Sequence, residues 1–125
     1  MQKKVIFAIQ ILAGLMLIVF GANKILGFME MQHGSLGMGA FMMALSESGY
    51  LMKLVAIVEI VAGISFLTNK YVALMAVVLM PVMINAFLAH LFLDPSGIAG
   101  AAVLLLFTVI IMVQQKDRYK QLLQP

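Results

Sequence analysis

The chain has 125 residues, of which 64% are hydrophobic and 10% are charged, and its mean hydropathy is +1.11. A soluble domain usually carries about 25% charged residues, and a domain this small cannot hide so much apolar surface in its own core. These proportions nearly exclude a water-soluble globule and predict one compact domain, residues 1–125, in contact with a lipid bilayer. The net charge is +3, but the cations are spread along the chain, so we do not expect nucleic acid as a partner.

Four uninterrupted apolar runs are each close to the length that crosses a membrane, and the last needs a few flanking residues to match it. An 18-residue helix covers ~27 Å of a hydrocarbon layer that is ~30 Å thick. The last three runs are joined by short turns, which predicts antiparallel neighbours in an all-α bundle of four transmembrane helices. In the second turn, Asp94 or Ser96 is expected to cap the helix that follows Pro95. The predicted spans are Val5–Ala22, Leu51–Thr68, Tyr71–Leu93 and Ile98–Val113.

The cations divide unequally between the two sides of this arrangement. The poorer side, which has fewer cations, holds Lys24 and Lys53, together with Glu30, Glu47 and Asp94. Because cytoplasmic segments carry the excess of Lys and Arg, both termini should be cytoplasmic. The richer side holds Lys3, Lys4, Lys70, Lys116, Arg118 and Lys120.

The connector from Asn23 to Tyr50 is long and lies on the poorer side. It contains several glycines, but residues 40–45 form an apolar stretch. This pattern predicts a short helix between the first and second spans, either interfacial or re-entrant over the mouth of the bundle. The chain has no cysteine, so disulfide and thiolate chemistry are excluded, and any redox work would need a borrowed electron carrier.

Polar side chains within the spans are the informative ones, because each is costly in lipid unless it faces the interior and finds a partner. Glu59 and Asn85 lie at equal depth, ~12 Å from the same side, on adjacent helices. Lys24 and Asn23 end the first helix on that side, and helical side chains lean towards the N-terminus, which points Lys24 towards Glu59. His90 is nearer the rim and is rotated by about 140° from Asn85, so the two residues either border one cavity from two sides or face different ways.

Each of these residues has a structural interpretation beside the functional one. Glu59 is either a proton-carrying or ligand-anchoring carboxylate, or it is neutral or locked in a pair with Lys24. Lys24 could instead extend to the lipid headgroups, and His90 could be a hydrogen-bonded rim residue. Asn85 could bridge two helices rather than hold a ligand.

Metal and haem sites are not expected, and neither is a covalent cofactor. Haem in a bilayer usually takes two axial histidines or a His/Met pair, but only His90 lies near a span, with His33 in the connector. The spans hold no pair of His and acidic residues at the spacing that zinc or di-iron sites use. Asp94 lies four residues after His90, but no serine has the setting of a catalytic triad.

The chain resembles the DoxX family of small four-helix bacterial membrane proteins. Two blocks that carry the resemblance are residues 20–28, Phe-Gly-Ala-Asn-Lys-Ile-Leu-Gly-Phe, and residues 59–63, Glu-Ile-Val-Ala-Gly. The most specific block follows Pro81 and covers residues 85–97, Asn-Ala-Phe-Leu-Ala-His-Leu-Phe-Leu-Asp-Pro-Ser-Gly. Gly49-Tyr50 before the second span also matches, so the resemblance covers almost the whole chain.

The resemblance implies a bacterial inner-membrane protein associated with quinone-linked oxidoreductases. The family takes its name from a subunit associated with a terminal quinol oxidase, and a related branch contains thiosulfate:quinone oxidoreductase subunits. One departure is at Gln10, where many relatives carry an arginine fourteen residues before Lys24. If that arginine binds an anionic substrate, this chain has lost that function.

These observations predict a quinone-linked, redox-associated subunit with a polar pocket near the outer face. Glu59 and His90 would pass protons, Asn23, Lys24 and Asn85 would bind the ligand, and a partner redox protein would supply electrons. Any enzymatic role would be that of an accessory subunit. The alternative is a non-enzymatic membrane scaffold or assembly factor for a partner protein. Homo-oligomerisation is a further expectation, from the small-residue pair Gly97 and Ala101.

Overall fold

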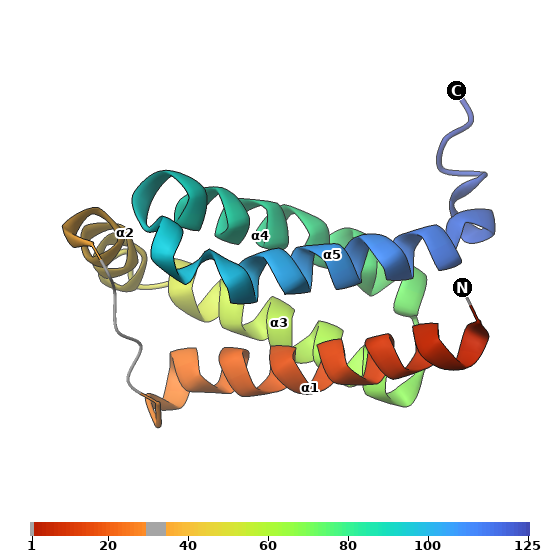
Figure 1. The fold of residues 1–125 in the computed structure, drawn as a ribbon, viewed down its shortest axis with the longest axis horizontal. Coiled ribbons are helices and arrows are strands. Elements are labelled where there is room, and N and C mark those ends of the chain that lie inside the picture. Colours follow the sequence, from red (N-terminus) through yellow and green to blue (C-terminus); the bar gives the residue numbers. More distant parts are fainter. Residues whose placement is uncertain (1, 30–34) are drawn as a thin grey trace.

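A computed structural model describes residues 2–29 and 35–125 of the chain (Figure 1). Glu30 and His33, which the sequence assigned to the connector, lie outside the described residues. The described part is all-helical. The long helices are α1 Lys3–Leu26, α3 Leu51–Thr68, α4 Val72–Leu93 and α5 Ile98–Gln114, and the shorter elements are α2 Leu36–Glu47 and the single turns η1 Pro95–Gly97 and η2 Lys116–Tyr119.

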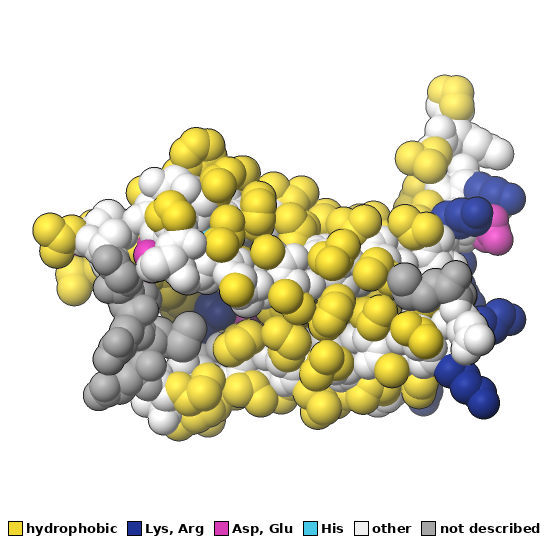
Figure 2. All heavy atoms as spheres, in the orientation of Figure 1, with side chains coloured by type: hydrophobic (Ala, Val, Ile, Leu, Met, Phe, Trp, Pro, Cys, Tyr) yellow, Lys and Arg dark blue, Asp and Glu magenta, His cyan; other side chains and the backbone are white. Residues whose placement is uncertain are grey.

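The four long helices are apolar and long enough to span a membrane, as the sequence predicted. Large apolar side chains remain exposed at mid-helix, among them Leu15, Ile57 and Leu106, each at 50% or more. Figure 2 shows hydrophobic side chains along the whole length of the bundle. Exposed apolar surface on this scale is costly in water and favourable in lipid, so the fold indicates a multi-pass membrane protein.

Helix α1 is longer than predicted at both ends. It continues through Lys24 to Leu26 because Asn23 and Lys24 keep the helical conformation. Gly27 then ends it in the left-handed region, with a φ of 65°, and donates its N–H to the carbonyl of Asn23. This is the usual way a glycine terminates a helix, and it holds Lys24 within the last turn.

Both termini lie at one end of the bundle, and α2 lies across the opposite end (Figure 1). We call these the terminal end and the α2 end. Lys and Arg side chains gather at the terminal end (Figure 2). Figure 2 therefore shows the charge asymmetry that the sequence led us to expect.

Helices α1 and α3 approach each other most closely, through glycines. A Cβ atom on Gly63 would lie 2.8 Å from the carbonyl oxygen of Gly14, and one on Gly21 would lie 3.0 Å from the carbonyl oxygen of Ala56. These partners run in opposite order along the two helices. Without side chains at these points the backbones reach van der Waals contact, which is a common way for apolar helices to associate in lipid.

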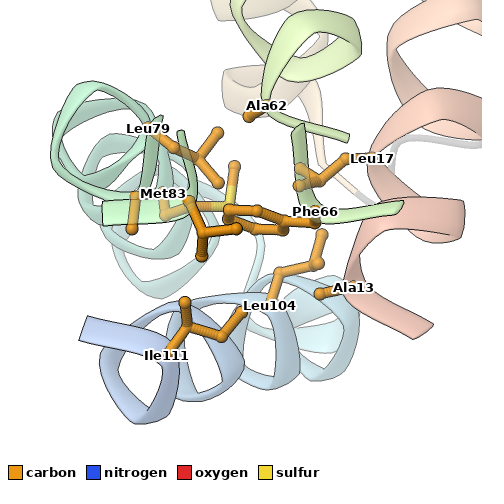
Figure 3. Close-up of a cluster of buried hydrophobic side chains, with 10 residues drawn as sticks. Ala13, Leu17, Ala62, Phe66, Leu79, Met83, Leu104 and Ile111 are labelled. Atoms are coloured by element: carbon orange, nitrogen blue, oxygen red, sulfur yellow. The ribbon is translucent and has the colours of Figure 1, made fainter. Parts of the chain in front are cut away.

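The core is centred on Phe66, which is fully buried (Figure 3). Leu17 from α1, Leu79 and Met83 from α4, and Ile111 from α5 pack around it. The small side chains of Ala13, Ala62 and Ala76 are fully buried in the same cluster. Large and small side chains thus interdigitate, as close packing requires.

The turn between α4 and α5 corrects one prediction. Neither Asp94 nor Ser96 caps α5, because the single turn η1 is inserted and Gly97 becomes the residue before the helix. The Ser96 hydroxyl instead donates to Asp94 Oδ1 at 2.5 Å. The two polar side chains therefore bond each other, and Asp94 is buried.

Candidate functional site: a polar cavity at the α2 end

A cavity of about 450 Å³ lies at the α2 end, where α1, α3 and α4 meet the inner face of α2. We call it the Glu59 cavity. Most of its wall is apolar, and α2 contributes Met38, Phe41, Met42 and Leu45. Its polar lining comes from Lys24, Glu59, Asn85, His90 and Asp94. A mainly apolar cavity with a few convergent polar groups is the usual form of a small-molecule site.

Lys24 and Glu59 form an ion pair in this cavity, which confirms the predicted approach of the two side chains. Lys24 Nζ lies 2.9 Å from Glu59 Oε2 and 3.1 Å from Oε1, so it donates to both carboxylate oxygens. The Glu59 side chain is only 6% exposed, whereas Lys24 retains 23%. The pair therefore leaves the ammonium as the more accessible partner for a ligand.

Local sequence explains why these two charges meet. Gly21 lies one turn before Lys24 and Ala56 one turn before Glu59, so in each helix the small residue and the charged residue share a face. A Cβ atom on Gly21 would lie 2.8 Å from Ile60 Cγ1 and 3.2 Å from Glu59 Cβ. The absence of a side chain at Gly21 brings α1 close enough for Lys24 to reach the carboxylate.

Asn85 and His90 line the same cavity. This is the predicted arrangement in which the two residues border one cavity, rather than the one in which they face different ways. His90 Nδ1 is buried and makes no hydrogen bond with the residues that the structure describes. Asn85 is exposed, and the structure gives it no hydrogen bond within the described ranges, so it does not bridge to Glu59. Both side chains are thus available to a ligand in the cavity.

Gly97 explains how the imidazole of His90 is accommodated. A Cβ atom at Gly97 would lie 3.1 Å from His90 Nδ1 and 3.4 Å from Asp94 Oδ2. The small residue therefore makes room for the His90 ring inside the chain. Packing against His90 gives Gly97 a role within one chain. The spacing of Gly97 and Ala101 had suggested homo-oligomerisation instead.

Asp94 is the cavity residue that sequence reasoning left out of the site. Its four-residue spacing from His90 was visible, but the spacing alone did not distinguish a cavity residue from a turn residue. The structure places it 5% exposed in the cavity wall. The signal that could have identified it is the Asp-Pro-Ser sequence after a span, which turns the chain back over the end of α4.

Asn23, which was predicted to bind the ligand, does not line the cavity. It is buried, and its Oδ1 accepts a hydrogen bond of 2.7 Å from the backbone N–H of Met29. One residue along a helix is a rotation of about 100°, which separates Asn23 from the face of Lys24. Asn23 therefore orders the chain after α1, and its assignment as a ligand-binding residue is not supported by this geometry.

Helix α2 closes one side of the cavity. Met38 on its inner face is 3% exposed. The hydroxyl of Ser35 accepts the N–H of Met38 and also donates to the carbonyl oxygen of Leu93, the last residue of α4. The start of α2 is therefore fastened to the end of α4, beside His90 and Asp94.

Gln10 lies far from this cavity, towards the terminal end. Its Nε2 donates to the carbonyl oxygen of Phe66 at 2.9 Å and to Asn69 Oδ1 at 3.0 Å. Asn69 ends α3 in the left-handed conformation, with a φ of 57°. Gln10 thus satisfies a helix C-terminus, and its position shows that it takes no part in the Glu59 cavity.

In the described ranges, no three His, Asp or Glu side chains lie close enough together to hold a metal ion. Comparison of the chain with protein-family models, with curated protein sequences and with solved structures gives no match. The resemblance to the DoxX family therefore stays a prediction from the sequence.

Proposed function

We propose that the Glu59 cavity binds the polar head of a small membrane amphiphile, and that a quinone fits it best. The observation that carries this proposal is the set of hydrogen-bond donors in an apolar cavity: Lys24 Nζ, the Asn85 amide and the His90 ring. Quinone carbonyl oxygens accept hydrogen bonds, and the apolar side chains of α2 and α3 would enclose the ring. The volume of about 450 Å³ is within the range of known ligand pockets.

The proposal includes a placement in the membrane. The four long helices form an antiparallel transmembrane bundle in a bacterial inner membrane, as expected for a DoxX-like protein. The cation-rich terminal end is cytoplasmic, by the positive-inside rule, and α2 lies at the outer interface over the cavity. Support comes from the exposed lysines at the terminal end and from the apolar inner face of α2.

Reduction of a bound quinone to a quinol consumes two electrons and two protons. A partner redox protein supplies the electrons, because the chain contributes no cysteine and no cofactor is implied by its sequence. His90 and the Lys24–Glu59 pair can relay protons to the two carbonyl oxygens, since each group can hold a proton. The protein is then an accessory subunit of a quinone-linked oxidoreductase.

Quinone binding to the purified protein in lipid nanodiscs tests the proposal. The double variant Lys24→Met/Glu59→Gln removes both charges together, so no unpaired charge is left in the bundle. We expect it to bind decylubiquinone about tenfold or more weakly, because a hydrogen bond from a charged donor contributes roughly 1.5–3 kcal/mol. The dissociation constants are measured by native mass spectrometry.

Lys53→Met is the matched control. Lys53 is an exposed lysine near the α2 end that does not line the cavity, so its loss should leave quinone binding unchanged. Equal binding by the wild type and the double variant would contradict the proposed site. Absence of binding by the folded wild-type protein would contradict a quinone as the ligand.

A membrane scaffold is the second candidate, and one observation favours it. The outer side of α2 exposes Leu36 at 94% and Met43 at 62%, which could dock a partner protein. In this case the Lys24–Glu59 pair only joins α1 to α3. A partner polypeptide that copurifies with the quinone-free protein, and that is lost on Leu36→Ser, would favour the scaffold.

A further inference from the structure

A second hollow lies on the outside of the bundle, in the surface between α4 and α5. Its volume is about 560 Å³, and it is lined by Val77, Met80, Pro81, Ile84, Asn85, Leu88 and Met112. We call it the α4–α5 groove. Val77, Ile84 and Leu88 are each about 40% exposed, so the groove opens on the side of the bundle that would face lipid.

The groove and the Glu59 cavity share two residues, Pro81 and Asn85. These residues are one helical turn apart on α4, so the two hollows adjoin along that turn. Elsewhere the walls differ: Val82, Ala86 and His90 face the cavity, whereas Ile84 and Leu88 face the groove. The shared turn therefore connects a polar interior to an apolar exterior.

Asn85 is the polar group at this junction. It lies eight residues inside the end of α4, ~12 Å from that end by helical rise, and it is exposed. An amide in the hydrocarbon layer costs free energy unless it is hydrogen-bonded, and the described residues give Asn85 no partner. A polar group that arrives from outside the chain would satisfy it.

We propose that the α4–α5 groove holds the hydrocarbon chain of the same amphiphile whose head lies in the Glu59 cavity. The amphiphile passes from the lipid over Pro81 and Asn85, and the Asn85 amide hydrogen-bonds the head at the junction. This inference rests on the proposed function, and it adds the route of entry and a requirement for a single apolar chain. From Val77 to Leu88 the groove follows α4 for ~16 Å, which suits an extended chain rather than a compact group.

Two probes separate the contribution of the hydrocarbon chain to binding from that of the polar head. The first is decylubiquinone, and the second is a benzoquinone with the same ring substituents and no alkyl chain. Ile84→Trp fills the groove without reaching the cavity, so it should weaken decylubiquinone binding about tenfold, equivalent to losing the burial of roughly two methylene groups. The chainless probe should bind this variant as it binds the wild type. Asn85→Leu should weaken both probes.

Ile57→Trp is the matched control, because Ile57 is an exposed mid-helix isoleucine on α3 outside both hollows. Leu88→Phe makes a smaller change at the other end of the groove and should act in the same direction as Ile84→Trp. Circular dichroism verifies that each variant is folded.

The outcomes are distinct. Unchanged decylubiquinone binding by both Ile84→Trp and Leu88→Phe would overturn the assignment of the groove as the site of the hydrocarbon chain, while leaving the proposed function intact. Equally weakened binding of both probes by these variants would also overturn this assignment, because the effect would then not depend on the alkyl chain of the probe. Failure of the wild type to bind either probe would overturn the proposed function itself. A dimer that Ile84→Trp dissociates without changing probe binding would assign the groove to a second copy of this chain and overturn the inference.

Discussion

The Lys24–Glu59 ion pair combines two groups that would each be costly alone in the bundle. Loss of one partner leaves an uncompensated charge, which typically destabilises a protein by about 3–5 kcal/mol, whereas replacement of both is often close to neutral. The pair is therefore consistent with a structural role and with a ligand site. The double variant Lys24→Met/Glu59→Gln removes both charges without leaving one unpaired, so a loss of quinone binding by this variant would favour the ligand site.

The contacts of Gln10 in the folded chain define its role. In the sequence it stands at a position where the resemblance to the DoxX family leads us to expect an arginine. In the structure it donates to Phe66 and Asn69 at the end of α3, far from the Glu59 cavity. Gln10 therefore takes no part in the polar cavity at the α2 end.

Tyr119 is a titratable side chain outside the spans that fastens the C-terminal segment to the bundle. Its hydroxyl donates to the carbonyl oxygen of Ala73 at 2.7 Å, and burial raises the pKa of this phenol above its ordinary value of about 10. The folded state therefore holds the Tyr119 proton more tightly than the unfolded state does. This contribution to stability is present below about pH 10 and is lost as the pH rises further.

We expect an ultraviolet titration to reveal this shift. The difference between the tyrosinate absorbance of the wild type and that of Tyr119→Phe isolates the curve of this one residue. Its midpoint should lie above pH 10 in the folded protein and return to about 10 in denaturant. A midpoint at or below 10 in the folded protein would show that the hydroxyl is solvated and that the contact with Ala73 is absent.

At the scale of the helix, contact between α1 and α3 depends on small residues at seven-residue spacing. Gly14 and Gly21 on α1 face Gly63 and Ala56 on α3. Two turns of helix separate the members of each pair, so both lie on one face. This interface sets the distance between the helices that carry Lys24 and Glu59.

The substitution Gly63→Ala tests this interface. The added methyl group would lie 2.8 Å from the Gly14 carbonyl oxygen and 2.6 Å from Ile18 Cγ1, so the helices must move apart. We expect a loss of about 1–3 kcal/mol in the free energy of unfolding, the usual range for overpacking. The measurement is equilibrium unfolding in mixed micelles.

Gly100→Ala is the control for this substitution. Gly100 is a helical glycine in α5 with open space around its Cα, so alanine should be neutral or slightly stabilising through its better helix propensity. Equal stability of the Gly63→Ala and Gly100→Ala variants would mean that α1 and α3 are not in backbone contact.

At the scale of the whole molecule, charge is segregated along the bundle. Six of the eight cationic side chains, Lys3, Lys4, Lys70, Lys116, Arg118 and Lys120, belong to segments at the terminal end. Lys24 is paired at the α2 end, so it contributes little net charge there. The asymmetry predicts that the terminal end faces the cytoplasm.

The cysteine-free sequence makes this orientation easy to measure. Ser46→Cys places a single thiol at an exposed position of α2, and Gln121→Cys places one in the exposed C-terminal segment. We expect a membrane-impermeant maleimide to label Ser46→Cys in intact spheroplasts and to label Gln121→Cys only after permeabilisation. The opposite pattern would invert the proposed topology and place the Glu59 cavity on the cytoplasmic side.

The sequence by itself determined the parts of this protein that depend on local composition. Continuous apolar runs located the four long helices to within a few residues, because hydropathy and helical rise fix the length of a span. Asn69 ends α3 within the turn that the sequence predicted, whereas α1 runs four residues past the predicted Ala22 before Gly27 ends it. The approach of Lys24 to Glu59 also followed from the sequence, because helical side chains lean towards the N-terminus.

The tertiary structure decided which face each helix turns towards its neighbours. Asn23 and Lys24 are adjacent in sequence, yet only Lys24 reaches the Glu59 cavity. Asn85 and His90 share this cavity, although counting left two arrangements open, and Asn85 also borders the α4–α5 groove. Rotation about a helix axis depends on contacts between segments far apart in the chain, here the glycines of α1 and α3. In an apolar sequence with weak amphipathic patterning, only those contacts specify it.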